Sequence, residues 1–158
     1  MMLAVALALA LAQGDAREPI GVFESWGAFR DVEPARCYAI AAPVQRRRRG
    51  AFASIATWPG KQVHNQLHIR LSRQRTPRAR VTLAIGERRF QLKAGDRDAW
   101  SPDARTDRAI VGAIRAGRSM SVESIAANGA PFADVYALAG AATAIDAAGV
   151  GCARRPAP

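Results

Sequence analysis

The sequence predicts a mostly-β fold, an antiparallel β-sandwich or barrel-like domain with one or two short helices. Apolar and polar residues alternate with a period of two in several short segments, the pattern of half-buried strands. Turn pairs such as Pro59-Gly60, Gly95-Asp96 and Asn128-Gly129 separate these segments. Only one segment begins and ends like an amphipathic helix. Many short strands at this spacing are typical of a sandwich or barrel.

Residues 1–12 are expected to be a signal peptide for export. After two methionines they form an apolar run of ten residues, whereas a membrane-spanning helix needs ~20. The run ends in Ala10-Leu11-Ala12, which fits the small-x-small cleavage pattern. No Lys or Arg precedes it, so a truncated gene start or a poorly processed anchor remains an alternative. Cleavage there leaves a single domain over residues 13–153 and a short frayed tail, 154–158.

The strands follow from the alternation. Leu67, Ile69 and Leu71 alternate with polar residues, and Gly86-Glu87 is expected to turn one strand into the next. The expected strands are Trp26–Arg30, Arg36–Ala42, Phe52–Trp58, the segment around Leu67, Val81–Ile85, Arg88–Leu92, Ser119–Glu123 and Phe132–Leu138.

One helix is expected between these strands. Ser101 is predicted to cap it, Pro102 suits its first position, and Gly117 ends it. A second, Ala-rich helix is expected over Gly140–Ala148. This helix would bring Cys152 back to the sheet.

Two cysteines, Cys37 and Cys152, occur 115 positions apart. An exported chain meets an oxidising compartment, which favours a disulfide between them. Closing a loop of this length stabilises a fold by about 4–5 kcal/mol. Two unrelated buried thiols are the alternative. The lack of a Cys-x-x-Cys disfavours a zinc or redox site.

The net charge of +10 is concentrated in the middle of the chain. Between Gln45 and Arg97 there are fourteen Lys or Arg and two acids, while the other residues carry nine basic and eleven acidic groups. Arginine binds phosphate and carboxylate through its planar guanidinium. The candidate anion-binding residues are Arg46, Arg47, Arg48, Arg49, Arg70, Arg73, Arg75, Arg78 and Arg80. A solvated surface that keeps the protein soluble is the alternative.

The run of four arginines, residues 46–49, lies between Pro43 and Gly50 and is expected to be an exposed loop. Its replacement by Ser is expected to leave stability nearly unchanged. Lipid phosphate, lipopolysaccharide or another envelope component is the expected partner, because an exported protein rarely meets nucleic acid.

The sequence carries no motif of a catalytic or metal site. His64 and His68 have the spacing of a zinc-protease helix, but Asn65 stands where that motif needs Glu. On a strand the two histidines lie ~13 Å apart, too far to share a metal. Gly-x-Ser-x-Gly, phosphate-binding and dinucleotide-binding patterns are missing. We therefore expect no catalytic residues, no metal and no cofactor.

An ordered set of short motifs extends from Trp26 to Cys152. In order these are Trp26-Gly27-Ala28-Phe29, Cys37-Tyr38-Ala39-Ile40, Trp58-Pro59, Trp100, Ile114-Arg115-Ala116-Gly117, Asp134-Val135-Tyr136-Ala137-Leu138-Ala139-Gly140 and Cys152. This order resembles the invasion-associated locus B family of bacterial envelope proteins. The resemblance implies an exported or periplasmic β-rich domain, linked in some pathogens to entry into host cells, and it brings no catalytic residues.

The expected function is that of an exported, non-enzymatic envelope protein. It would bind an anionic component or a partner protein, and it would be periplasmic or peripheral to a membrane. The alternative is a hydrolase or other enzyme acting on envelope polymers. An acid beside His64 or His68, or two convergent acids in a cleft, would favour the enzyme.

Overall fold

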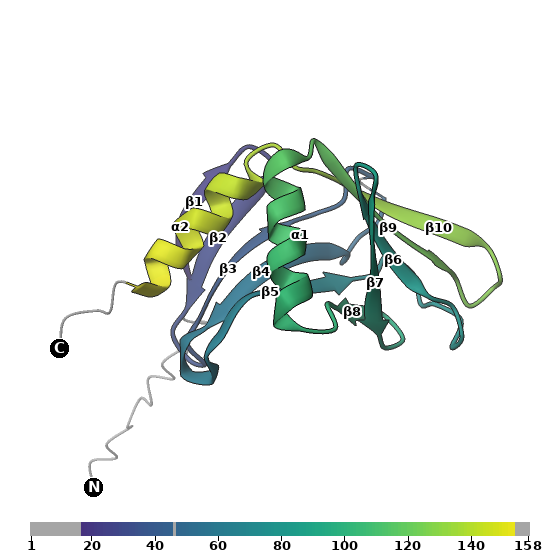
Figure 1. Cartoon of the computed structure of the whole chain (residues 1–158), viewed down its shortest axis with the longest axis horizontal. Helices are drawn as coiled ribbons and strands as arrows, with labels where there is room; N and C mark the ends of the chain where they lie inside the picture. The colour runs from purple at the N-terminus through teal and green to yellow at the C-terminus, as the bar shows by residue number, and fades with distance from the viewer. Residues whose placement is uncertain (1–16, 46, 154–158) are drawn as a thin grey trace, which may run out of the picture.

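Ten antiparallel strands form one sheet in the computed structural model, which describes residues 17–45 and 47–153 (Figure 1). The predicted signal peptide and tail lie outside the described residues. The strands are β1 (Arg17–Phe23), β2 (Trp26–Asp31), β3 (Arg36–Ala41), β4 (Phe52–Trp58), β5 (Val63–Arg70), β6 (Val81–Ile85), β7 (Arg88–Ala94), β8 (Asp98–Trp100), β9 (Ser119–Ile125) and β10 (Pro131–Ala137). The helices are a short 3-10 turn (Pro59–Lys61), α1 (Ala104–Ala116) and α2 (Ala141–Ala153).

The strand order is β1-β2-β3-β4-β5-β8-β7-β6-β9-β10, and the sheet curls as Figure 1 shows. The segment that follows β3 covers part of the outer edge of β10. The Val44 amide donates to the carbonyl of Val135 (2.8 Å), and the side-chain amide of Gln45 bonds to Ala133 and Val135 as a strand residue would. The predicted fold class, a mostly-β antiparallel fold with two short helices, is confirmed. It takes the form of one curled sheet.

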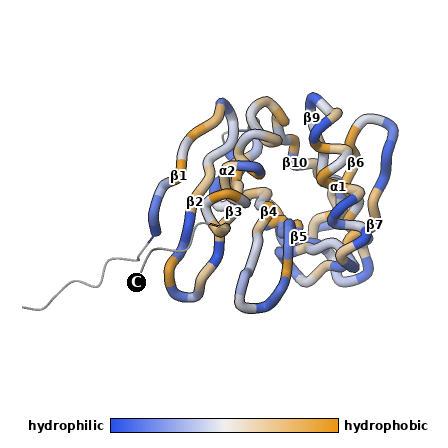
Figure 2. Tube along the Cα trace, turned by 60° about the vertical axis from the view of Figure 1, so that its left-hand side comes forward, coloured by the Kyte–Doolittle hydropathy of each residue, from blue (hydrophilic) through white to orange (hydrophobic). Residues whose placement is uncertain are grey.

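One face of the sheet and both helices enclose the core. Leu67 and Ile69 of β5 are fully buried, as is Leu83 of β6, and they pack with Ile114 of α1 and Ile145 of α2. Alternate residues of β5 and β9 therefore point to the core, as the alternation predicts. We call the opposite side of β2–β5, β8 and β7 the open face. Figure 2 shows β7 as mostly hydrophilic along its length.

Helix α1 begins two residues later than predicted. Asp103, and not Ser101, is its N-cap, and the Asp103 carboxylate accepts from the Thr106 amide (2.7 Å). Ser101 is buried and donates to the Asp107 carboxylate, which also accepts from the Leu67 amide (2.9 Å). Asp107 thereby bonds the amide of the β5 residue that comes just before His68–Arg70, the part of β5 that pairs with β8. Burial raises the pKa of Asp107, and its two hydrogen bonds oppose this shift.

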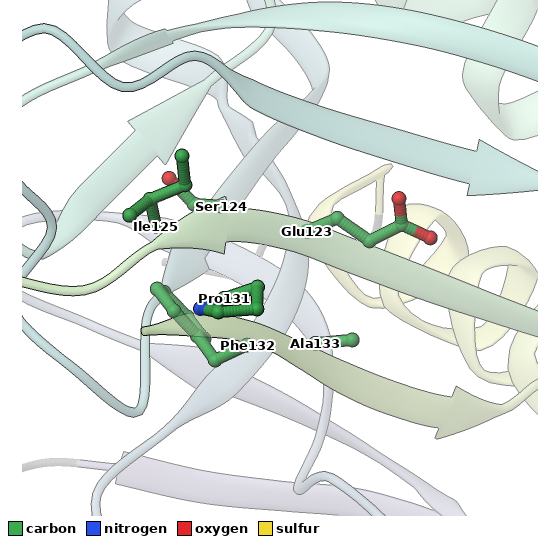
Figure 3. Close-up of a pocket in the computed structure, with 6 residues that line it drawn as sticks. All are labelled: Glu123, Ser124, Ile125, Pro131, Phe132 and Ala133. Atoms are coloured by element: carbon green, nitrogen blue, oxygen red, sulfur yellow. The ribbon is translucent and has the colours of Figure 1, made fainter. Parts of the chain in front are cut away.

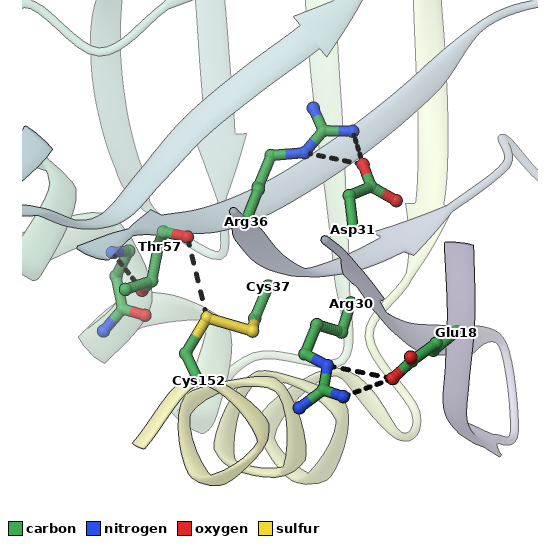
Figure 4. Close-up of a disulfide and its surroundings, with 8 residues drawn as sticks. Glu18, Arg30, Asp31, Arg36, Cys37, Thr57 and Cys152 are labelled. Atoms are coloured by element: carbon green, nitrogen blue, oxygen red, sulfur yellow. Dashed lines mark hydrogen bonds and ion pairs between the residues drawn. A yellow bond between two sulfur atoms is a disulfide. The ribbon is translucent and has the colours of Figure 1, made fainter. Parts of the chain in front are cut away.

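A disulfide joins Cys37 of β3 to Cys152 of α2, with 5.7 Å between the Cα atoms (Figure 4). The predicted pairing is thus present in the structure. Helix α2 continues to Ala153, five residues beyond its predicted end, and so presents Cys152 directly to the sheet. The bond fixes the last helix to an early strand. No helix among the described residues has the length and apolarity needed to span a membrane.

Candidate functional site: a basic end of the sheet

Arg48 is the anchor of the arginine run. Its guanidinium forms an ion pair with Asp134 of β10 (2.6 Å) and donates to the hydroxyl of Ser72 (3.1 Å). Asp134 is fully buried and also accepts from the amide (2.9 Å) and the hydroxyl of Ser72. A buried carboxylate needs such partners, because desolvation of an unpaired charge is costly. Residues 47–49 are therefore held against the segment just after β5 and the middle of β10.

This geometry corrects the expectation that the whole run is an exposed loop of equivalent arginines. Only 24% of the Arg48 side chain is exposed, and this residue has a structural role. Arg47 and Arg49 on either side of it are exposed, and neither has a hydrogen bond or ion pair among the described residues. Arg46 lies outside the described residues.

The same buried cluster contains Tyr136, two residues along β10 from Asp134. The Tyr136 side chain is fully buried, and its hydroxyl has no hydrogen-bond partner within the described part of the chain. Burial and the negative charge of Asp134 both raise the pKa of Tyr136, whereas Arg48 lowers it. The phenol is therefore held in its neutral form.

Arg75 is also structural. Its guanidinium donates to five backbone carbonyls, those of Thr76, Pro77 and Ala79 in its own loop and those of Ala94 and Gly95 at the end of β7. These bonds use all three guanidinium nitrogens and join the β5–β6 loop to the β7–β8 turn. In this conformation Arg75 therefore has no free pair of N–H groups with which to bind an anion, as its predicted role would require.

Three predicted arginines of the β5–β6 loop, Arg73, Arg78 and Arg80, are exposed and make no side-chain polar contact with other described residues. Arg73 lines a shallow hollow of about 320 Å³ together with Arg97 and Asn128. Arg97 is not among the anion-binding residues expected from the sequence. It belongs to the same basic segment, but only the β7–β8 turn brings it to Arg73.

These arginines share one end of the sheet. Arg48 bonds to Ser72, the neighbour of Arg73, so the 47–49 segment lies against the start of the β5–β6 loop. Among the described residues, the exposed guanidinium groups of this basic end are those of Arg47, Arg49, Arg73 and Arg97. An anion with several charged oxygens could engage more than one of them, because each presents a planar donor fork to solvent.

Arg70 differs from this group because it lies on the open face and already has an acidic partner. It bonds to Asp98 of β8, and the same carboxylate contacts Nε2 of His68 at 2.8 Å. The histidine stacks on Trp100 with ring centroids 5.3 Å apart and meets the edge of Phe52. Asp98 is thus the acid beside His68 that would favour an enzyme.

No nucleophilic side chain of the described residues lies in hydrogen-bonding contact with this His–Asp pair. Ser54 is the cross-strand neighbour of His68 but is buried, and no hydroxyl or thiol among the described residues hydrogen-bonds to the imidazole. His64 is exposed and lines a hollow of about 360 Å³ beside Cys152. The described residues contain no group of three side chains that could hold a metal.

A second cationic and aromatic cluster covers the other end of the open face. Arg36 lies over the rings of Tyr38 (4.3 Å) and Trp58 (4.9 Å), and it pairs with Asp31, as does Arg17. Partial burial raises the pKa of Asp31, but the two arginines outweigh it and lower the pKa overall. Figure 4 shows the Arg36–Asp31 pair near the disulfide. The Asp31 carboxylate thus already pairs with both Arg17 and Arg36.

A further hollow has a different chemistry. It encloses about 520 Å³ beside β9 and β10 and is lined by Ile125, Pro131 and Phe132, and Glu123 is the one charged residue among the described residues that line it (Figure 3). A carboxylate at this position would repel an anion. The hollow is therefore no part of the basic end.

Comparisons with known proteins identify the fold. No family model and no curated protein matches the chain. Among solved structures, it is similar to the crystal structure of invasion associated protein B from Bartonella henselae, with a TM-score of 0.63 and 13% identity. The alignment covers 85% of this chain and 98% of that one. The fold implied by the sequence resemblance is thereby confirmed.

Proposed function

We propose that this protein is an exported, non-enzymatic binding module of a bacterial cell envelope, and that its basic end recognises an anionic envelope component. The apolar run at residues 1–12, the disulfide and the fold shared with invasion associated protein B support the envelope location. The ligand class follows from the exposed guanidinium groups. Phosphate groups of lipid or lipopolysaccharide match their charge and geometry.

The observation that carries this proposal is the anchoring of Arg48. Four adjacent cations repel one another, and a free loop would let solvent separate them. Here the charge of Arg48 is instead neutralised by the buried Asp134. This pair fixes the backbone of Arg47 and Arg49 beside Arg73. An anion then meets guanidinium groups on a fixed backbone, so less conformational entropy is lost on binding.

Co-sedimentation with vesicles tests this proposal. The variant Arg47→Gln/Arg49→Gln/Arg73→Gln removes three charges from the basic end and leaves Arg48 in place. The matched control, Arg105→Gln/Arg108→Gln/Arg118→Gln, removes three exposed charges from α1 and its flank. We expect the first variant to lose most of its retention on vesicles containing phosphatidylglycerol at low salt. The control should retain most of its binding. Equal retention by both variants would refute the site.

A hydrolase acting on envelope polymers is the second candidate, and the His68–Asp98 pair favours it. A carboxylate can orient an imidazole and stabilise its protonated form. Incubation of the protein with purified envelope polymers should release no product. Product release that disappears in the Asp98→Asn variant would replace the binding proposal with the enzymatic one.

A further inference from the structure

Trp100 is a large aromatic residue held in a fixed position on an exposed surface. It retains 37% of its surface exposed although His68 stacks on its ring with an interplanar angle of only 6°. An exposed side chain is normally free to change rotamer, and ordering it costs entropy. Contacts outside the hydrophobic core must therefore hold the Trp100 indole in place.

The support comes from two layers of contacts. The imidazole of His68 lies between Trp100 and Phe52, and its Nε2 contacts Asp98 at 2.8 Å. Asp98 is in turn bonded to Arg70. The strand register enforces this arrangement, because His68 pairs with Trp100 and Arg70 pairs with Asp98 across β5 and β8. The two pairs are neighbours on the open face.

The polar groups beside the indole include both donors and acceptors. Each oxygen of the Asp98 carboxylate accepts one bond, from His68 or Arg70, and has capacity for another. Arg70 uses one of its nitrogens on Asp98, and its side chain is 41% exposed. Lys93, the cross-strand neighbour of Trp100 on β7, adds a further exposed donor.

An aromatic plane flanked by donors and acceptors matches the chemistry of a sugar. The C–H face of a pyranose packs on an indole, and hydroxyl groups both donate to a carboxylate and accept from a guanidinium. A nucleobase would also stack, but a saccharide carries more hydroxyl groups that can donate to the Asp98 carboxylate. A lone acid does not exclude a saccharide, and the neighbouring cations favour one that carries carboxylates.

We propose that the open face at β5 and β8 is a saccharide-binding platform, with a pyranose ring on Trp100 and its hydroxyl groups on Asp98 and Arg70. Acidic saccharides bind more tightly than neutral ones of the same length because of Arg70 and Lys93. This platform does not depend on the basic end, which recognises charge through a separate set of arginines.

Calorimetric titration with galacturonic-acid tetramer and with N-acetylglucosamine tetramer tests the platform. Both should bind saturably, the acidic one more tightly. The Trp100→Ala variant should lose about tenfold in affinity for each, equivalent to about 1.4 kcal/mol, while Trp100→Phe retains most of it. The Trp58→Ala variant serves as the matched control, because Trp58 is a partly exposed tryptophan outside the platform. Thermal denaturation checks that every variant is folded.

Three results would overturn the platform: no saturable binding of either tetramer, unchanged affinity in Trp100→Ala, or tighter binding of an oligothymidine than of both tetramers. Retention on anionic vesicles distinguishes a failure of the saccharide platform from a failure of the anion-binding site at the basic end. Trp100→Ala should keep full retention on anionic vesicles, and the Arg47/Arg49/Arg73 variant should keep its affinity for the neutral tetramer. Each proposal can therefore fail alone.

Discussion

Replacing Arg48 by Met removes a charge from a buried pair while keeping most of the apolar stem. Breaking a buried pair by removing one partner costs about 3–5 kcal/mol. Asp134 keeps two bonds to Ser72, so we expect the lower end, about 3 kcal/mol. For a domain of this size, about 1 kcal/mol shifts the Tm by about 4 °C. The Arg48→Met variant should therefore melt about 12 °C below the parent.

Chemical and thermal denaturation measure this loss, and the neighbouring arginines are the controls. Arg47→Met and Arg49→Met should change the free energy of unfolding by less than about 0.5 kcal/mol, because both side chains are exposed. The double variant Arg48→Met/Asp134→Asn should lose less than the sum of its single variants, since the buried charge is then removed as well. If Arg48→Met has the same Tm as the two control variants, the Arg48–Asp134 pair does not anchor the run.

Three further predictions concern stability. The Cys37→Ala/Cys152→Ala variant should lose about 4–5 kcal/mol in denaturant titrations, because the open chain regains its loop entropy; an unchanged midpoint would contradict this. Asp107→Ala should lose about 1–3 kcal/mol, since the buried Leu67 amide is left unpaired. Asp107→Asn keeps that acceptor and should be at least as stable as the parent at pH 7, because the raised pKa of Asp107 means that its charged form destabilises the fold above pH 3.8. The lowered pKa of Asp31 has the opposite sign: its stabilisation is present above pH 3.8 and is lost as the pH falls through the folded pKa. Acid titration of stability should therefore be shallower in Asp31→Asn, and an identical acid transition would count against the Asp31 pairs.

Strands with a clear buried face could be predicted from the sequence. Val81–Ile85 begins and ends where the alternation indicates, and Phe52–Trp58 has the bounds expected from the turn residues on either side of it. Strands β1 and β8 are not among the expected strands. Edge strand β1 is mostly exposed and contains Pro19, so it has no regular buried face. Strand β8 has three residues, too few for alternation to be recognised.

The candidate site shows a different limit. Four consecutive arginines are equivalent in sequence, and their local context predicts one exposed loop. What distinguishes Arg48 is Asp134, which lies 86 positions further along the chain. The same holds for Arg75, whose carbonyl acceptors come partly from the β7–β8 turn. Net charge and its location are properties of the sequence, but the division into structural and free arginines depends on tertiary contacts.

The salt dependence of binding to lipopolysaccharide is the most direct test of the proposed function. The dissociation constant is measured between low and high salt for the parent, the Arg47/Arg49/Arg73 variant and the matched Arg105/Arg108/Arg118 control. We predict steep weakening with salt for the parent and the control, because screening acts on the exposed guanidinium groups. The Arg47/Arg49/Arg73 variant should bind more weakly at low salt and show a flatter dependence. Identical curves for the two triple variants would contradict a binding site at the basic end.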